Sequence, residues 1–331
     1  MSELIEKVER KKGFFELNFD DYQTLKKLIS PESGNLQSLM TELRYNNESR
    51  EFINLPHIGP IDVPKPIIPD DIIFRGQADS NWALTPSLFR SAKLHHISSP
   101  QGLVEREYEN LIKFQKFCDR AGVQIPGDSF SRRQLQSNIV KNFSTNHLKD
   151  FWHEDFIEIA TFAQHFGLET SFLDWSRNIL TASYFASMGA MNECMRLGID
   201  SLPNGFSIWV LNNTNLDPKI IKLIEPPKSI NNHISYQNGL LTVAKISPDI
   251  TRFPNPQSPA KKEPKDFSLE SVFSFYKKDH LLLKLNIPFF FAEDIFNYCD
   301  AYNFNACNLF RGAHGAVQHF KDLETLSKFS T

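Results

Sequence analysis

The chain has few residues that could cross-link a fold or hold a metal ion. Its 331 residues include only four cysteines, and none of them forms a Cys-x-x-Cys pair. This pattern matches neither a disulfide framework nor a zinc ribbon, so we expect reduced thiols and no metal site. Free thiols are typical of a reducing compartment, which indicates a cytoplasmic protein.

Long apolar runs and a strong charge imbalance are also missing. The most apolar stretch, residues 281–292, is interrupted by Lys284, Asn286 and Pro288, and it is too short to span a bilayer. The first residues lack the apolar core of a signal peptide. The formal net charge of −3 provides no basic field for general nucleic-acid binding. We therefore expect neither a membrane nor a nucleic acid as partner.

What the sequence does contain indicates a large folded core. Hydrophobic residues make up 41%, and there are 29 phenylalanines, which argues against disorder. We expect an α+β fold with a mixed sheet core and flanking helices. We divide the chain into an N-terminal helical and extended region, residues 1–69, and a main domain, residues 70–325, with a proline-rich loop at 252–266. The elements expected in the main domain are strands near 71–74, 205–211, 240–244 and 280–287, and helices near 103–121, 156–166, 178–190 and 292–302.

The first candidate site residues follow a short apolar strand, in the run Phe74-Arg75-Gly76-Gln77. An arginine at the end of a strand is held rigidly, and its guanidinium suits bidentate recognition of phosphate or carboxylate. Gly76 has no Cβ to keep a ligand from the backbone. The alternative is that Arg75 pairs with a carboxylate at the core edge and Gly76 only forms a turn.

A second group surrounds Asp174-Trp175-Ser176. We expect the preceding helix and a short apolar segment to deliver Asp174 and Ser176 to the start of another helix, where both are favoured N-caps. The same helix start could attract an anion, with Trp175 as a stacking wall. A third, weaker signal is Gln237, which either belongs to an ordinary turn or projects its amide into a cleft.

Taken in order, these blocks resemble the FRG domain family, which is named after its Phe-Arg-Gly motif. The resemblance runs from about Asp70 to Phe320. Its blocks are Phe74-Arg75-Gly76, Pro86-Ser87-Leu88-Phe89-Arg90, Gln164-His165-Phe166-Gly167, Thr170, Leu173-Asp174-Trp175-Ser176, Tyr184-Phe185-Ala186 and Gln237-x-Gly239.

The chain departs from the family pattern at four places. Ser171 stands where the family usually has an arginine, and His233 takes the place of a basic residue before the Gln237 block. In the closing block, Arg311 and His314 replace a proline and an aspartate. If the missing arginine binds ligand in the family, this chain binds a different ligand or binds it less tightly.

The resemblance implies a bacterial or phage protein, and the order Arg75, Ser176, Gln237 is more loosely similar to ADP-ribosyltransferases. That similarity implies NAD as cofactor and an ADP-ribosyltransferase-like fold. Arg75 would hold a pyrophosphate, and Asp174 would stabilise the positive charge that develops on the ribose. The catalytic candidates are thus Arg75, Asp174 and Gln237. The ligand-binding candidates are Gly76, Gln77, Arg90, Gln164, His165, Thr170, Trp175 and Ser176.

Two functions follow from these expectations. The first is an NAD-using enzyme that transfers ADP-ribose or hydrolyses NAD, as a toxin or anti-phage effector. The second is a non-catalytic module of a bacterial defence system that senses a nucleotide-like ligand or a partner. Gln237 carries no negative charge, so nucleotide binding has more support than catalysis. Residues 1–69 are the candidate region for docking a protein partner.

Overall fold

The computed structural model describes residues 2–47, 52–55, 59–62, 67–90, 100–142, 153–198, 204–214, 216–226, 237–244 and 267–329. The predicted proline-rich loop, residues 252–266, and His233 lie outside these ranges. Among the described helices, none has the length and apolar character needed to cross a membrane.

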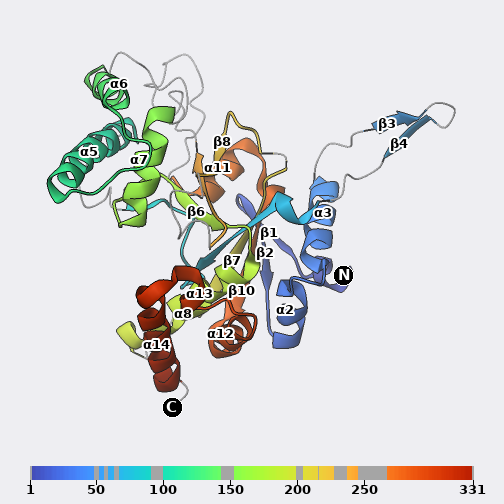
Figure 1. Ribbon diagram of the computed structural model, residues 1–331. Helices are drawn as coiled ribbons and strands as arrows, with labels where there is room; N and C mark the ends of the chain where they lie inside the picture. Colours follow the sequence, from blue (N-terminus) through green and yellow to red (C-terminus); the bar gives the residue numbers. More distant parts are fainter. Residues whose placement is uncertain are drawn as a thin grey trace.

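An eight-stranded mixed sheet forms the centre of the molecule (Figure 1). Neighbouring strands are antiparallel except for β2 and β10, which are parallel. The predicted α+β class with a mixed sheet core and flanking helices is therefore confirmed. In spatial order the strands are β1 (Glu9–Lys11), β2 (Phe14–Asn18), β10 (Leu282–Pro288), β7 (Gly205–Asn212), β5 (Ile72–Gln77), β6 (Leu173–Ser176), β9 (Gly239–Ala244) and β8 (Ile221–Ile224).

Helices flank the sheet, and a small separate hairpin projects from the body (Figure 1). The hairpin pairs β3 (Phe52–Leu55) with β4 (Gly59–Asp62). Among the described residues, short 3-10 turns cover Pro69–Asp71, Asp279–Leu281 and Phe289–Phe291. The described α-helices include α1 (Ser2–Glu6), α2 (Tyr22–Ile29), α3 (Asn35–Asn47), α5 (Pro100–Ala121), α6 (Phe130–Lys141), α7 (Glu154–His165), α8 (Ile179–Leu197), α11 (Leu269–Tyr276), α12 (Ala292–Ala301), α13 (Ala306–Phe310) and α14 (Gly312–Phe329).

The N-terminal region contributes two strands to the main sheet, which the sequence analysis did not anticipate. Phe15 and Leu17 on β2 are buried while their neighbours are less so. This alternation is the period of a half-buried strand, but five residues of it are too few to stand out in a polar segment. The division of the chain at residue 69 into two domains stays a prediction.

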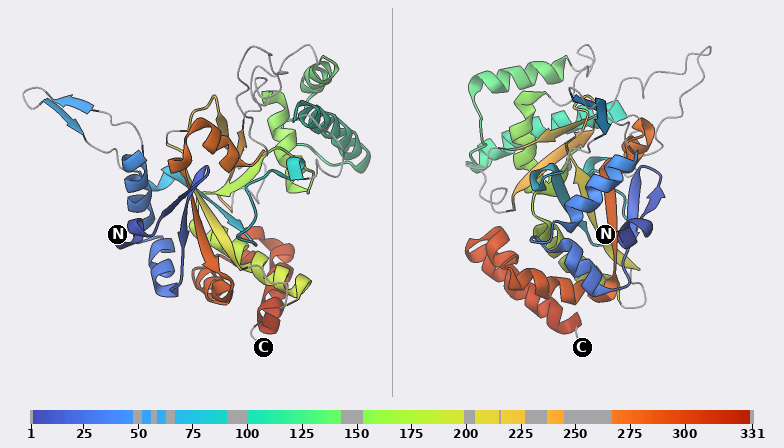
Figure 2. Two further views of the ribbon diagram at one scale, coloured as in Figure 1. Left: turned by 180° about the vertical axis from the view of Figure 1, so that it is seen from behind. Right: turned by 90° about the vertical axis from the view of Figure 1, so that its right-hand side faces the viewer.

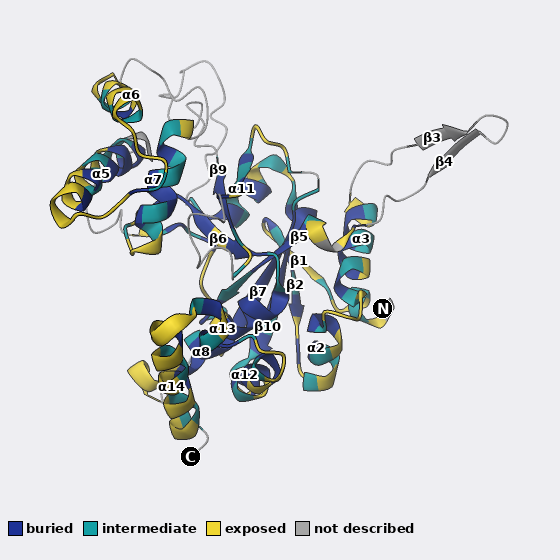
Figure 3. Ribbon diagram, in the orientation of Figure 1, coloured by how far each residue is buried: buried dark blue, intermediate teal, exposed yellow. Residues whose placement is uncertain are grey.

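The sheet separates two hydrophobic clusters. On one face, the buried helix α8 and helices α2, α3 and α12 pack on Leu17, Phe74 and Ile208. On the other face, α11 packs on Trp209 and Leu282. The centre of the fold, including β5, β7 and α8, is accordingly buried, whereas α6 and α14 expose much of their surface (Figure 3).

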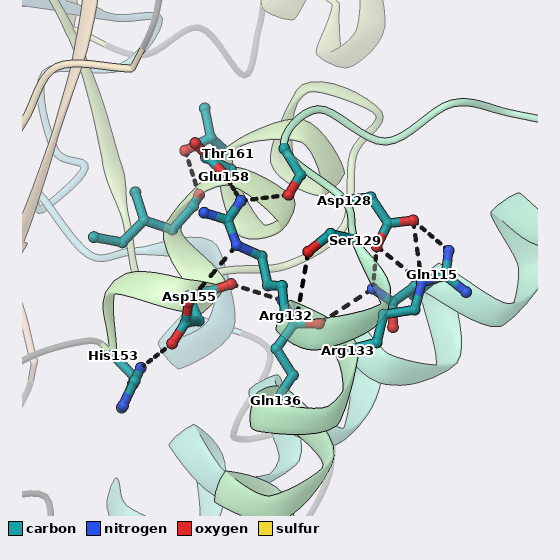
Figure 4. Close-up of polar contacts among 12 residues, drawn as sticks. Gln115, Asp128, Ser129, Arg132, Arg133, Gln136, His153, Asp155, Glu158 and Thr161 are labelled. Atoms are coloured by element: carbon teal, nitrogen blue, oxygen red, sulfur yellow. Dashed lines mark hydrogen bonds and ion pairs between the residues drawn. The ribbon is translucent and has the colours of Figure 1, made fainter.

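Helices α5, α6 and α7 form a third layer beyond β9 and β8, at one end of the sheet (Figure 2). Apolar residues of α5 and α7, among them Leu111 and Phe156, pack there against Leu241 and Val243. In this layer, Arg132 of α6 forms an ion pair with α7, and Arg133 forms one with the segment before α6 (Figure 4). Arg133 also pairs with Asp119 of α5.

Candidate functional site

The site begins where strands β5 and β6 part. β5 pairs with β6 only at Phe74↔Ser176, while it continues along β7 as far as Gln77. In place of further ladder bonds to β6, the Nη1 atom of Arg75 donates to the backbone carbonyl of Asp174 at 2.8 Å. A side chain therefore satisfies a backbone acceptor that the neighbouring strand leaves open.

A hollow of about 200 Å³ lies at this gap. Its walls come from the ends of β5 and β6, the C-terminal end of α7 and the segment after β5. The lining residues are Arg75, Ser87, Arg90, Gln164, Gly167, Leu168, Phe172, Leu173 and Asp174.

The charges in this lining are unbalanced, with two guanidinium groups and one carboxylate. The Asp174 side chain is 65% exposed, and its Oδ2 atom lies 3.5 Å from Nη1 of Arg75. Arg75 is mostly buried, and burial lowers the pKa of its guanidinium; Asp174 opposes this shift, whereas the like charge of Arg90 adds to it. The Nε atom of Arg75 is buried and has no partner among the described residues. The lining thus carries one positive charge more than its own carboxylate balances.

A chain of hydrogen bonds fixes the walls of the hollow to one another. Gln164 at the end of α7 donates through Nε2 to Asp174, and its Oε1 accepts from the Thr170 hydroxyl at 2.5 Å. The backbone N–H of Thr170 donates to Ser87 Oγ at 3.0 Å, and the N–H of Leu88 donates to the Thr170 carbonyl at 3.1 Å. Thr170 therefore acts on the site by joining two walls.

Glu107 on α5 supports the same segment from behind, and the sequence analysis missed it. Its carboxylate accepts from the N–H of Ser171 at 2.7 Å, at the position where the family resemblance places an arginine. Glu107 is fully buried, and burial raises its pKa to about 8, against the lowering by hydrogen bonds from Ser171. The signal was present in the sequence, since Glu107 lies at helical spacing from Val104 and Leu111 in an apolar stripe.

Three predicted ligand-binding residues face the interior instead of the hollow. A Cβ on Gly76 would lie 2.1 Å from the Ala182 carbonyl, so this glycine permits close packing of α8 on the sheet. Gln77 is buried and accepts from the indole N–H of Trp209 at 2.7 Å. Trp175 is also buried, with its indole N–H bonded to Thr242.

Ser176, Gln237 and His165 also lie outside the lining. Ser176 donates through Oγ to the Gln237 carbonyl at 2.7 Å, two residues along β6 from Asp174. His165 is exposed at the end of α7, with its ring against that of Phe166. Of the predicted site residues, the hollow therefore brings together Arg75, Arg90, Gln164 and Asp174.

The predicted helix start at Asp174 and Ser176 is wrong. Both residues lie in strand β6, and Asn178 is the N-cap of α8, where its side chain accepts from the N–H groups of Leu180 and Thr181. Asparagine is as good a cap as aspartate or serine, so a propensity argument could not choose among them. Because the hollow lies at the C-terminal end of α7, its attraction for anions depends on the guanidinium groups and not on a helix N-terminus.

Comparison with known proteins supports the resemblance drawn from the sequence. Residues 70–193 match the model of the FRG domain. The chain contains an FRG domain. The matched range contains every residue that lines the hollow, whereas Gln237, Arg311 and His314 fall outside it. No curated protein and no solved structure matches the chain.

Proposed function

We propose that the FRG domain of this chain binds a nucleotide-like ligand of the NAD or ADP-ribose class, with the phosphates in the hollow. The observation that carries this proposal is the pair of guanidinium groups, Arg75 and Arg90, which share the hollow with a single carboxylate. Guanidinium binds phosphate through charge-assisted and often bidentate hydrogen bonds. A bound phosphate would supply the negative charge that the lining lacks.

The size of the hollow limits which part of such a ligand it holds. Pockets that enclose a whole drug-sized ligand are roughly 300–1,000 Å³, and this hollow is about 200 Å³. It therefore suits a diphosphate, with the sugars and bases of a dinucleotide lying outside. This predicts that inorganic pyrophosphate, ADP-ribose and NAD all bind through the same arginines.

Arg75 is the better anchor of the two arginines. Its Nη1 is already fixed by the Asp174 carbonyl, so little side-chain entropy is lost when an anion binds. An incoming phosphate would compete with the Asp174 carboxylate, which is the exposed and therefore more easily displaced partner. Arg90, which is exposed and has no ion-pair partner among the described residues, would close on the ligand from the other wall.

A second candidate function is cleavage of NAD, by ADP-ribosyl transfer or hydrolysis. Asp174 favours it, because departure of nicotinamide builds positive charge on the ribose, which a carboxylate stabilises. In hydrolysis, water would attack the ribose carbon as its bond to nicotinamide breaks, and ADP-ribose, nicotinamide and a proton would be released. Gln237 adds no carboxylate, and Asp174 already bonds Gln164 and faces Arg75. Binding is therefore our primary proposal, and a role as toxin or anti-phage effector depends on turnover.

Calorimetric titration of the chain and of Arg75→Ala with ADP-ribose and with pyrophosphate tests the proposal. We expect the variant to lose at least about 100-fold in affinity for both ligands, the cost of a charged, hydrogen-bonded anchor. Equal affinity of variant and parent would refute the site. Incubation of the parent with NAD, followed by an assay for free nicotinamide, then separates an enzyme from a sensing module.

A further inference from the structure

We propose that Lys284 and Gln77 are positioning residues that hold the Ser87–Arg90 wall of the hollow in place. They act through the backbone of residues 80–84, and neither side chain lines the hollow. The inference rests on the proposed function, because it concerns the two arginines proposed to bind phosphate. It explains how Arg90, which lies outside the sheet, is held at a fixed position relative to Arg75 on β5.

Lys284 lies in the same cross-strand row as Arg75. In the sheet register, Lys284 on β10 is opposite Trp209 on β7, and Trp209 is opposite Arg75 on β5. Directly opposed residues point to the same face of a sheet. Trp209 therefore lies between two cations, one of which lines the hollow.

The burial of Lys284 needs a compensating partner. The residue is only 7% exposed, and its Nζ lies 5.1 Å from the ring centroid of Trp209. Burial lowers the pKa of Lys284, while Glu16, Glu270 and Asp79 oppose the shift. Its hydrogen bond goes to the backbone carbonyl of Ser80 and not to any of these carboxylates. The buried donor therefore holds a loop.

Gln77 makes a second attachment three residues further along the same loop. Its Oε1 accepts from the Trp209 indole at 2.7 Å, and its Nε2 donates to the Ala83 carbonyl at 3.2 Å. The indole fixes which way the amide points, because only Oε1 can accept its N–H. Gln77 therefore connects Trp209, which lies between Lys284 and Arg75 in the cross-strand row, to the loop of residues 80–84.

Helix α11 makes the third attachment. The Glu270 carboxylate accepts from the N–H of Leu84 at 3.0 Å, and the N–H of Leu269 donates to the Leu84 carbonyl at 3.0 Å. Residues 80–84 are thus held from β10, β5 and α11. The wall begins three residues later at Ser87, and the N–H of Leu88 donates to the Thr170 carbonyl. Since a binding group must be held within about 0.5 Å of its productive position, these attachments decide where Arg90 stands.

The test uses Gln77→Met and Lys284→Met, which keep the side-chain bulk and remove the donor. The matched control is Lys222→Met on β8, far from the loop in strand order. Amide hydrogen exchange at Leu88 reports on the placement of the wall without any ligand. We expect exchange about tenfold faster in either loop variant, a local opening that leaves the core amides of α8 unchanged. Unchanged exchange at Leu88 would overturn the inference.

A double-mutant cycle with Arg90 shows whether the effect reaches the hollow. Inorganic pyrophosphate is titrated into the parent, Gln77→Met, Arg90→Ala and the double variant. If Gln77 acts by placing Arg90, Arg90→Ala should weaken binding about tenfold in the parent but less than about threefold in the Gln77→Met background. Equal losses in both backgrounds would show a merely structural role and sink the inference.

Failure of the proposed function gives a different result. In that case the parent would not bind pyrophosphate, or Arg75→Ala would bind it equally well, while the exchange measurement would still decide whether Gln77 and Lys284 hold the wall. Should Lys284→Met fail to fold, Gln77→Glu provides a second variant. It keeps the acceptor for Trp209, and it can donate to Ala83 only when protonated. Pyrophosphate changes its own charge with pH in every variant, so the parent is titrated at the same pH values. Relative to the parent, the affinity of Gln77→Glu should fall as pH rises, and an unchanged ratio would count against a positioning role of Gln77.

Discussion

Two pairs of arginines, Arg132 and Arg133 on α6 and Arg75 and Arg90 around the hollow, differ in the number of carboxylates that surround them. On α6, Arg132 faces Asp155 and Glu158. Arg133 beside it bonds Asp119 and Asp128. Each of these guanidinium groups has two carboxylates, and Figure 4 shows both partners of Arg132 together with Asp128 beside Arg133. The two guanidinium groups in the hollow share one carboxylate.

This difference separates arginines that hold helices together from arginines that are available to a ligand. The α6 pairs connect α5, α6 and α7, and an added anion would meet four carboxylates there. In the hollow, the Nε atom of Arg75 is buried without a described partner, and Asp174 is largely exposed. The number of carboxylates per guanidinium, and not the number of arginines, therefore distinguishes the proposed anion site from the α6 cluster.

The largest expected effect comes from making the hollow resemble the α6 cluster. Arg90→Glu would leave one guanidinium between two carboxylates, so we expect pyrophosphate affinity to fall by more than about 100-fold, since like charges at a binding site cost several kcal/mol. The melting temperature should not fall, because the variant removes the repulsion between Arg75 and Arg90. Calorimetry and thermal unfolding measure the two effects.

Arg120→Glu is the matched control for this charge reversal. Arg120 is exposed on α5, next to the ring of Phe117 and outside the lining of the hollow. It changes the net charge of the chain by the same amount. If pyrophosphate affinity falls equally in both variants, the net charge of the chain and not the hollow governs binding. The contrast between the two pairs of arginines would then be refuted.

The sequence predicted the site residues that come at the end of a short apolar segment. Arg75 and Asp174 were predicted on that basis, and Gln164 from the resemblance to the FRG domain family; all three line the hollow. The parting of β5 and β6 could not be predicted, because it depends on pairing between strands about 100 residues apart. Gly76 and Trp175 illustrate the reverse case, in which motif residues serve the packing of the core.

Two residues that matter for the walls carried a sequence signal that was not used to predict the site. Lys284 interrupts an apolar run, and Glu107 interrupts an apolar helical stripe. A charge in either place must find a buried partner or change its protonation state. Lys284 donates to the Ser80 carbonyl, and Glu107 accepts from the N–H of Ser171. Which partner each one finds is set by the tertiary fold and lies beyond a local pattern.

Glu107 sharpens the comparison, because it is a buried carboxylate that pairs with no arginine among the described residues. Its pKa is raised from 4.5 to about 8, so the unfolded chain releases the proton first, and stability falls as pH rises between these values. The loss is about 1.4 kcal/mol per pH unit at most. We expect Glu107→Gln to remove this slope and to be more stable than the parent at pH 9. Urea unfolding at pH 5, 7 and 9 measures it.

The outcome at pH 5 provides the internal control for Glu107→Gln. There the parent carboxyl is protonated and resembles the amide, so the two proteins should differ little. A parent stability that stays flat from pH 5 to 9 would mean that Glu107 remains ionised, and that an unidentified cation or water compensates it.

A smaller effect on stability is expected at Arg133, whose guanidinium is paired with two carboxylates. Arg133→Ala leaves Asp119 and Asp128 facing each other at a partly exposed site, so we expect a loss of about 1 kcal/mol in unfolding free energy. Pyrophosphate affinity should not change. Urea unfolding and calorimetry together test this. A drop in affinity as large as that of Arg75→Ala would erase the distinction between the two kinds of arginine.

The smallest expected effect distinguishes the two roles open to Asp174. As a counter-ion it competes with an incoming phosphate for Arg75, so Asp174→Asn should raise pyrophosphate affinity about threefold, the size of an exposed ion pair. The amide still accepts from Gln164, which preserves the wall. As a catalytic carboxylate it would instead be needed for release of nicotinamide from NAD. A variant that binds more tightly and still releases nicotinamide at the parent rate would exclude catalysis by Asp174, because a neutral amide cannot stabilise the positive charge that develops on the ribose.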